Sequence, residues 1–384
     1  MVPARQPTND TVERTALIHR EIVQLSVLIF VAIAAFWLTR AVAASNRDMS
    51  LRDAAEWYRR GQQAIETGRV DDAIDSLRRA TVRDRHDKRY VLALARALAL
   101  KRDDEAARNA LLTLRESSPE DPDINLQLAR LAAGRQDVTE ALRFYHNALY
   151  APWPSEQADA RRQVRFELIR FLLTHDQASR ALSELLALST DLPDDAPLHL
   201  EVAQLFANAG DNGHALEQFQ RALRLAPENG EALAGAGQAA FQLGNYVLAR
   251  SYLRRVPAGA DEARNIREVV NLVLSNDPLA NRLGSTERRR RLKANFSYAQ
   301  QRWDTCLEQR SGGQSTSAEL ALQREARAFE DQLKPPGILE QDTVETGVDL
   351  IDRIEQQVVQ RCGPPTALDR ALALIGRQHG ADAR

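Results

Sequence analysis

An alanine recurs along this chain of 384 residues with a step of 34 residues. The recurring alanines form two series that differ in phase by six residues: Ala73, Ala107 and Ala141, then Ala181, Ala215 and Ala249. Four residues after each alanine stands a leucine or an aromatic residue, and three residues further on an alanine, leucine or valine. Offsets of four and seven place one apolar stripe along a helix. The spacing therefore predicts six copies of one helical unit, which must stack because none can bury its stripe alone.

Residues upstream of each alanine indicate a second helix in every unit. Twelve residues before the alanine, five of the six units have a small residue: Gly61, Ala95, Ala129, Ala203 and Gly237. Small residues are expected where two antiparallel helices of a hairpin cross closely. Five residues before the alanine, three units have a glycine, which a turn with positive φ favours. Each unit is therefore expected to be a helix-turn-helix hairpin.

The first unit, AAEWYRRGQQAIETGRVDDAIDSLRRATVRDRHD, carries several of these residues in a known spacing: Trp57, Gly61, Gly68, Ala73 and Ala80. In period and in these positions the series resembles the tetratricopeptide repeat, a 34-residue helix-turn-helix unit. The resemblance implies an all-α fold in which six repeats over residues 54–263 form a solenoid, a right-handed superhelix. It also implies a concave face that usually holds another protein.

The third and fourth units are separated by a longer connection than the others. The additional residues fall near residues 150–161, where prolines mark an extended segment. The fourth unit also has Ile169 at the position that is small elsewhere. A kink or slipped stacking is therefore expected in this unit.

An uncharged apolar segment lies near the start of the chain, at residues 22–39. As a helix it would reach about 27 Å, close to the thickness of a hydrocarbon core. We interpret it as a single-pass transmembrane anchor between a short tail, residues 1–21, and a linker, residues 40–53. Two alternatives are a buried core helix and a signal peptide cleaved after AVA at residues 41–43.

Arginines are evenly divided on the two sides of this segment, so the positive-inside rule does not orient it. A short N-terminal tail followed by a large folded domain most often leaves the tail in the cytoplasm. The repeats are therefore expected outside the cytoplasm, on the periplasmic side of a bacterial cell envelope.

The last part of the chain, residues 264–384, keeps helical spacing but loses the 34-residue period. We expect a C-terminal helical cap on the solenoid, and in an oxidising compartment a disulfide between Cys306 and Cys362 could tie two of its helices together. The run ERRRRLK at residues 287–293 is expected to be a solvated helix face. The alternative is a contact with anionic lipid or an acidic partner.

The sequence carries no signature of an enzyme, a cofactor or a metal site. GAGQAA at residues 235–240 fits a nucleotide-binding pattern, but no strand is expected before it and its glycines lie in a helix with a packing reason to be small. The net charge of −2 provides no general attraction for nucleic acid. A small-ligand or glycan-binding module, or an enzyme with its site in the C-terminal helices, remains the alternative to a scaffold that assembles other proteins.

The resemblance places the first helix of each unit along the groove, with the residue just after the small position pointing into it. These residues are Gln62, Arg96, Arg130, Arg170, Gln204 and Gln238, and Arg89 and Asn208 lie nearby. Guanidinium groups bind carboxylates in a bidentate fork. The hypothesis is that an acidic or extended segment of a partner protein lies across units two to four. The alternative is that each arginine pairs with an acid of a neighbouring unit.

Overall fold

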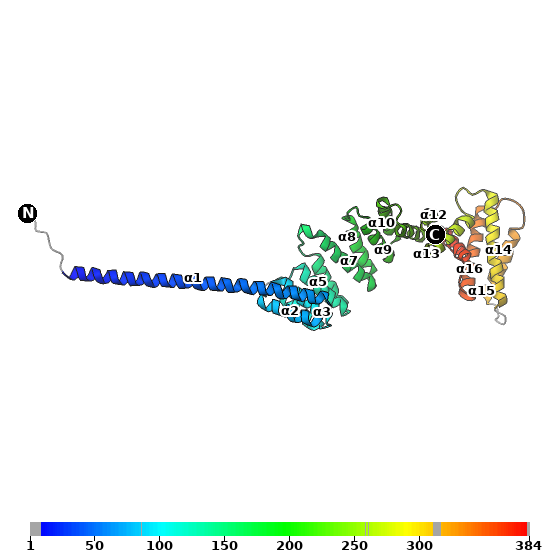
Figure 1. The fold of residues 1–384 in the computed structure, drawn as a ribbon. Helices are drawn as coiled ribbons and strands as arrows, with labels where there is room; N and C mark the ends of the chain where they lie inside the picture. Colours follow the sequence, from blue (N-terminus) through cyan, green and yellow to red (C-terminus); the bar gives the residue numbers. More distant parts are fainter. Residues whose placement is uncertain (1–8, 86, 258, 260, 310–315, 382–384) are drawn as a thin grey trace, which may run out of the picture. The chain divides into compact units, whose positions relative to one another are not determined.

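The computed structural model describes residues 9–85, 87–257, 259, 261–309 and 316–381. Within these ranges the chain consists of helices and their connections, and contains no strand (Figure 1). It divides into two compact units, residues 1–168 and 169–384, each of which is described by itself. The expectation of an all-α fold is confirmed.

The first unit contains three helical hairpins and the start of a seventh helix. Its helices are α1 (Asn9–Glu66), α2 (Val70–Arg83), α3 (Lys88–Leu100), α4 (Asp104–Ser117), α5 (Pro122–Gly134) and α6 (Val138–Leu149). The 3₁₀ turn η1 (Ser155–Gln157) and α7 (Ala158–Thr174) follow, and the boundary between the units falls within α7.

The second unit contains the remaining repeat helices and the C-terminal helices. The repeat helices are α8 (Ala178–Thr190), α9 (Ala196–Asn208), α10 (Asn212–Leu225), α11 (Gly230–Gln242) and α12 (Tyr246–Leu253). The C-terminal helices are α13 (Asp261–Asn276), α14 (Ser285–Gln309), α15 (Ser317–Gln332), α16 (Gln341–Cys362) and α17 (Ala367–Ala381).

The recurring alanines lie on the second helix of each hairpin, where each is at most 1% exposed. The small position on the first helix faces the residue four positions after the alanine. A Cβ added to Gly61 would lie 2.6 Å from Cγ of Leu77, and one added to Gly237 would lie 2.6 Å from Cγ of Leu253. Both distances are too short for van der Waals contact, so the close helix crossing requires the small residue.

The turn inside each hairpin has one residue in the left-handed region, five positions before the alanine. In three hairpins it is a glycine, with φ of 73° at Gly68, 86° at Gly210 and 72° at Gly244. The other three have Arg102, Gln136 and Asp176 with φ between 56° and 67°. An L-residue with a side chain adopts this conformation at a cost. The backbone geometry is thus kept in all six turns, although only half of them have the residue that suits it.

The helix α1 is much longer than its partners and extends far beyond α2 and α3 (Figure 1). It runs without a break through residues 40–53, so the segment interpreted as a linker is helical. Its side chains from residue 20 to residue 49 are exposed, and packing begins near Ala54, which is fully buried. The part from Arg20 is long and apolar enough to cross a membrane, a test that a signal sequence also passes. The apolar segment is not buried in the described structure, in contrast to a core helix.

The connection before α7 is held by two side chains. Trp153 donates from Nε1 to the carbonyl of Ala148 at 2.9 Å, and Arg161 donates from Nε to the carbonyl of Leu149 at 3.1 Å. Because Arg161 already belongs to α7, part of the additional sequence forms extra helix rather than loop. Ile169 is fully buried.

The C-terminal helices form a core of their own around Trp303, Phe329 and Ile354. A Cβ added to Gly347 of α16 would lie 2.5 Å from Cζ of Phe329, so these helices approach closely. The Cα atoms of Cys306 and Cys362 lie 5.7 Å apart, within the range of disulfides, and the structure joins the two residues by a disulfide. The bond links the end of α14 to the end of α16. Through α13, which packs on α11, α12 and α17, these helices adjoin the sixth hairpin.

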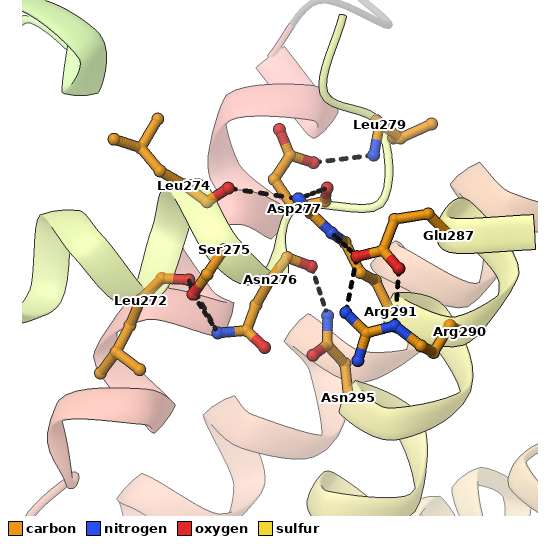
Figure 2. A network of polar contacts seen from close by, with 10 residues as sticks. All are labelled: Leu272, Leu274, Ser275, Asn276, Asp277, Leu279, Glu287, Arg290, Arg291 and Asn295. Carbon is orange, nitrogen blue, oxygen red and sulfur yellow. Dashed lines mark hydrogen bonds and ion pairs between the residues drawn. The ribbon is translucent and has the colours of Figure 1, made fainter. Parts of the chain in front are cut away.

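The junction between α13 and α14 is a network of polar side chains (Figure 2). The last carbonyl groups of a helix have no partner within the helix. At the end of α13 these carbonyl groups accept hydrogen bonds from side chains of α14. Arg291 donates from one nitrogen to the carbonyls of Leu274 at 3.2 Å and Asp277 at 3.1 Å. One turn further along α14, Asn295 donates to the carbonyl of Asn276 at 2.8 Å.

These contacts correct the expectation that residues 287–293 form a solvated face. Arg291 is held in the junction, and Arg289 donates to the carbonyls of Leu333 at 2.7 Å and Gly337 at 3.1 Å. Arg290 is exposed and pairs with Glu287 (Figure 2). Hydrogen bonds from Arg290 and Arg291 lower the pKa of Glu287 to about 2.

We expect replacement of Arg291 by alanine to destabilise the α13–α14 junction by about 2 kcal/mol, because two partly buried carbonyls lose a charged donor. Hydrogen exchange of the amides at the end of α13, measured on the full chain, reports the change as faster opening. The matched control is Arg290→Ala, which removes a side chain that is 68% exposed from the same helix. It should change the opening free energy by less than about 0.5 kcal/mol. Equal effects of the two substitutions would contradict the capping role.

Candidate partner-binding groove

The residues just after the small positions all lie on first helices of the hairpins. Arg96, Arg130, Arg170 and Gln238 are exposed, and Gln62 and Gln204 are half-buried. Gln62 donates to the hydroxyl of Tyr58 on its own helix at 2.7 Å. All six side chains are thus at least partly accessible to solvent.

Two of the arginines line the same cavity in the first unit. Arg96 of α3 and Arg130 of α5 both border a cavity of about 250 Å³. Its apolar lining comes from α3, α4 and α5: Ala95, Ala99, Leu100, Ala107, Leu111 and Leu131. Gln127, Arg102 and Asp104 add polar groups. The cavity thus combines an apolar surface with guanidinium groups, a combination suited to a segment that carries both an apolar side chain and a carboxylate.

A second cavity, of about 490 Å³, lies in the second unit and is lined by polar side chains. Gln204 and Asn208 of α9 and Gln238 of α11 border it, together with Glu231 and Glu262. Gln204 donates to a carboxylate oxygen of Glu231 at 2.6 Å. This cavity is acidic and amide-rich, in contrast to the arginine-lined cavity of the first unit.

Within the described structure, the three arginines differ in whether they have an acidic partner. Arg130 makes a two-point contact with Glu167 of α7, with Nε 2.9 Å from Oε2, and this bond raises the pKa of Arg130. Arg170 pairs with Glu201 of α9. For Arg96 the described residues provide no ion pair. Arg130 is therefore partly neutralised, and Arg96 is the one of these three arginines for which the described residues provide no carboxylate.

Comparison with protein families gives a match to the tetratricopeptide repeat over residues 58–122, 105–156 and 200–263. The chain contains tetratricopeptide repeats. The matched residues include the hairpins that form both cavities. No curated protein matches the sequence.

Several solved structures of tetratricopeptide repeat proteins are similar at low identity. YrrB, described as a TPR protein with an unusual peptide-binding site, is 18% identical, with a TM-score of 0.41 over 51% of this chain and 100% of YrrB. Pseudomonas aeruginosa PilF is 16% identical, with a TM-score of 0.41 over 58% of this chain and 98% of PilF. PilW, described as a type IV pilus biogenesis factor, is 16% identical, with a TM-score of 0.40 over 56% and 97%. Values this low say nothing about a shared partner.

The pairing of the arginines follows a rule within the tetratricopeptide repeats. Glu167 and Glu201 each stand two residues before the small position of the repeat that follows the arginine. The corresponding position after Arg96 is occupied by Gln127, which has no charge. The alternative offered from the sequence, pairing with an acid of a neighbouring unit, is what the structure shows for Arg130 and Arg170. The individual partners were not named, although the residue two before each small position was visible in the same frame.

Arg89 does not belong with the other arginines. Its guanidinium bonds to Asp87, the residue that caps the start of α3, with Nε 3.0 Å from each carboxylate oxygen. The hydrogen bond from Arg89 lowers the pKa of Asp87, and Arg89 is 67% exposed. It is not among the residues that line the arginine cavity. Arg89 as a groove residue stays a prediction, and in this structure its guanidinium is bound to Asp87.

The described residues bear on two further kinds of site, a metal site and a nucleotide site. No group of three or more histidine, cysteine, aspartate or glutamate side chains is placed to hold a metal ion there. Gly235 of the GAGQAA segment lies within α11, and a Cβ on it would lie 2.2 Å from the ring of Phe219. Its small size is therefore explained by helix packing.

Proposed function

We propose that this chain is a membrane-anchored scaffold whose tetratricopeptide repeats hold an acidic or extended segment of a partner protein. The observation that carries the proposal is the exposed Arg96 beside the apolar lining of the first cavity, without an acidic partner among the described residues. Arg96 would bind a carboxylate of the segment, and the neighbouring alanine and leucine side chains would contact an apolar residue next to it.

Position in a cavity strengthens such a contact. A guanidinium beside low-dielectric walls is screened less than one on an open surface, and it matches a carboxylate with two parallel hydrogen bonds. Arg130 could exchange Glu167 for the partner's carboxylate, but this exchange gains less because one ion pair replaces another. The contribution of Arg96 is therefore expected to exceed that of Arg130 and Arg170.

A photo-activatable amino acid at Leu100, which lines the cavity and is 54% exposed, tests the proposal in intact membranes. We expect irradiation to join the chain to a partner through an acidic segment, identified by mass spectrometry of the linked peptide. Arg96→Ala should reduce this product at least tenfold, in line with the loss of a charged hydrogen-bonded pair. Added salt should weaken capture by the unaltered chain.

Arg89→Ala is the matched control, because it removes an exposed arginine of the same helix that does not line the cavity. It should leave the cross-linked product unchanged. If Arg96→Ala captures the same peptide as strongly as the unaltered chain, the cavity is not the binding site.

We further propose that residues 22–39 anchor the chain in a bacterial cytoplasmic membrane, with the repeats on the periplasmic side. The support is the exposed apolar surface of α1 and the disulfide between Cys306 and Cys362, a bond that persists in oxidising compartments. A protein of this arrangement would assemble its partners at the envelope.

The redox state of the two cysteines tests the location. If cells are denatured directly in the presence of a thiol-reactive label, we expect neither Cys306 nor Cys362 to be labelled unless a reductant is added first. Cys306→Ser should expose Cys362 to labelling without reductant, which shows that the reagent reaches the site. Two thiols labelled in the unaltered chain would speak against both the bond and the periplasmic placement.

A further inference from the structure

A groove of about 630 Å³ lies outside the two cavities described above, between the last repeat helices and the C-terminal helices. Four helices border it: α11, α13, α16 and α17. Phe241 of α11 and Val359 of α16 contribute apolar surface, and Val359 is 41% exposed. An apolar groove with exposed members at the junction of two folded regions is a common place for a partner to bind.

Two matching stripes form the long walls of this groove. On α13 the lining residues are Glu262, Asn265, Ile266 and Val269, and on α17 they are Arg370, Ala373, Leu374 and Arg377. Both sets have the spacing i, i+3, i+4, i+7, so each is one face of a helix over two turns, or about 10 Å. The middle of the α17 stripe is apolar, with Ala373 and Leu374, and the α13 stripe has Ile266 beside the polar Asn265. Two neighbouring ridges of this kind leave a furrow into which the ridge of a third helix fits.

Most of the charged side chains that line this groove form no ion pair with another described residue. Arg370 and Arg377 are exposed, and the described residues give neither of them an ion pair or a hydrogen bond. Arg377 does lie close enough to Asp352 to interact with its charge. Asp369, which also lines the groove, is already bound by Arg302 at 2.5 Å and by the hydroxyl of Tyr298 at 2.7 Å. Two free guanidinium groups therefore face one remaining carboxylate, that of Glu262.

We propose that this groove is a second docking surface, which binds an amphipathic helix of a partner protein carrying two acidic side chains about two helical turns apart. The apolar face of that helix would cover Phe241, Ile266 and Leu374. Its two carboxylates, seven residues apart, would match the spacing of Arg370 and Arg377 on α17. In repeat arrays the groove beside each first helix is covered by the first helix of the next repeat. After α13 no further repeat follows, and α17 packs on α13 in its place, so a helix supplied by a partner would lie in the furrow between α13 and α17.

Binding of synthetic helical peptides to the full-length protein tests this proposal. The first probe is a fluorescein-labelled peptide of eighteen residues with leucines on one face and glutamates seven residues apart. The second has lysines in place of the glutamates, and the third has the first composition in scrambled order. We expect the acidic amphipathic peptide to bind at least tenfold more tightly than either of the others, as measured by fluorescence anisotropy.

A charge reversal makes the test specific. The double substitution Arg370→Glu and Arg377→Glu should reverse the preference, so that the lysine peptide binds better than the glutamate peptide. The exposed control Arg324→Glu on α15 should leave the preference as it is, and far-ultraviolet circular dichroism verifies that each variant is folded. Arg96→Ala should also leave it unchanged, which separates this surface from the arginine cavity of the repeats.

Three results would overturn the proposal. The first is equal affinity for all three peptides, or no binding at all, in the unaltered chain. The second is competition by dodecanoate: if dodecanoate binds the groove and displaces the peptide at the concentration that saturates its own binding, the site belongs to an acyl chain. The third is self-association of the protein that is lost with Val359→Asp, which would assign the groove to a second copy of this chain.

Discussion

Replacement of Ala215 by tryptophan should reduce the free energy of unfolding of the second unit by about 1 to 3 kcal/mol or more. Ala215 lies in α10, is fully buried, and belongs to the close crossing of α9 and α10, where Ala203 is fully buried as well. An indole at this position cannot be accommodated unless the two helices separate. Chemical denaturation of the full chain, followed by hydrogen exchange of α9 and α10, measures the loss.

Glu217→Trp provides the control for this substitution. Glu217 lies two residues away on the same helix, is exposed, and pairs only with Arg221 across one turn. The same indole placed there should change stability by less than about 0.5 kcal/mol. Unchanged stability of Ala215→Trp would mean that the helix crossing has been assigned to the wrong residues.

The second large effect should come from Glu355, whose carboxyl group is buried in the C-terminal helices. Glu355 is 1% exposed, and neither of its carboxylate oxygens has a hydrogen-bond partner among the described residues. Burial raises its pKa to about 7, and the nearby carboxylate of Asp369 on α17 adds to the shift. Arg302 on α14 acts in the opposite direction, and Asp352 on the same helix raises the pKa further.

The direction of the pH effect follows from the two pKa values. An unfolded glutamate has a pKa of about 4.5, so between about pH 4.5 and pH 7 the folded chain binds a proton that the unfolded chain releases. The contribution of Glu355 to stability is therefore fully present below pH 4.5 and decreases as the pH rises through this window. A shift of this size corresponds to about 3 kcal/mol, all of which is lost by pH 8.

Glu355→Gln removes the charge and should abolish this dependence. We expect the variant to match the unaltered chain at pH 4 and to exceed it at pH 8 by as much as about 3 kcal/mol in the opening free energy of α16. Glu345→Gln, an exposed substitution on the same helix, should match the unaltered chain at both pH values. A stability difference between Glu355→Gln and the unaltered chain that is the same at pH 4 and pH 8 would show that the carboxyl group does not titrate in this range.

Packing constraints explain why the repeat could be predicted so closely. Ala73, Ala141 and Ala249 must be small because helices cross there, and steric exclusion leaves a clear trace in a sequence that repeats it. The turn conformation was harder to predict from the sequence than the helix crossing. At Arg102, Gln136 and Asp176 the backbone adopts the same positive φ as at the glycines, because the helices on either side determine the turn. Composition alone could not show this.

The candidate site was predictable in position but not in charge state. The helical phase placed Arg96 and Arg130 on the same face, and the structure brings both to one cavity. Whether an arginine is free depends on the first helix of the next repeat, through Glu167 for Arg130 and Gln127 for Arg96. Contacts of this kind join residues more than thirty positions apart, and they become visible only when the repeat frame is applied to both partners. The groove between α13 and α17 could not be predicted in this way, because the 34-residue period ends before these helices.

The unbroken course of α1 has a mechanical consequence for the anchor proposed here. A flexible linker would let the repeats rotate freely relative to the membrane segment. A continuous helix instead fixes the orientation of the first hairpin relative to that segment. Each residue of an α-helix advances 1.5 Å and turns by about 100°. The number of residues between Thr39 and Ala54 therefore sets two quantities: the distance of the first hairpin from the membrane surface, and its rotation about the axis of α1. One inserted residue would barely change the height, yet it would swing the arginine cavity through more than a quarter of a circle relative to whatever else is fixed in the membrane.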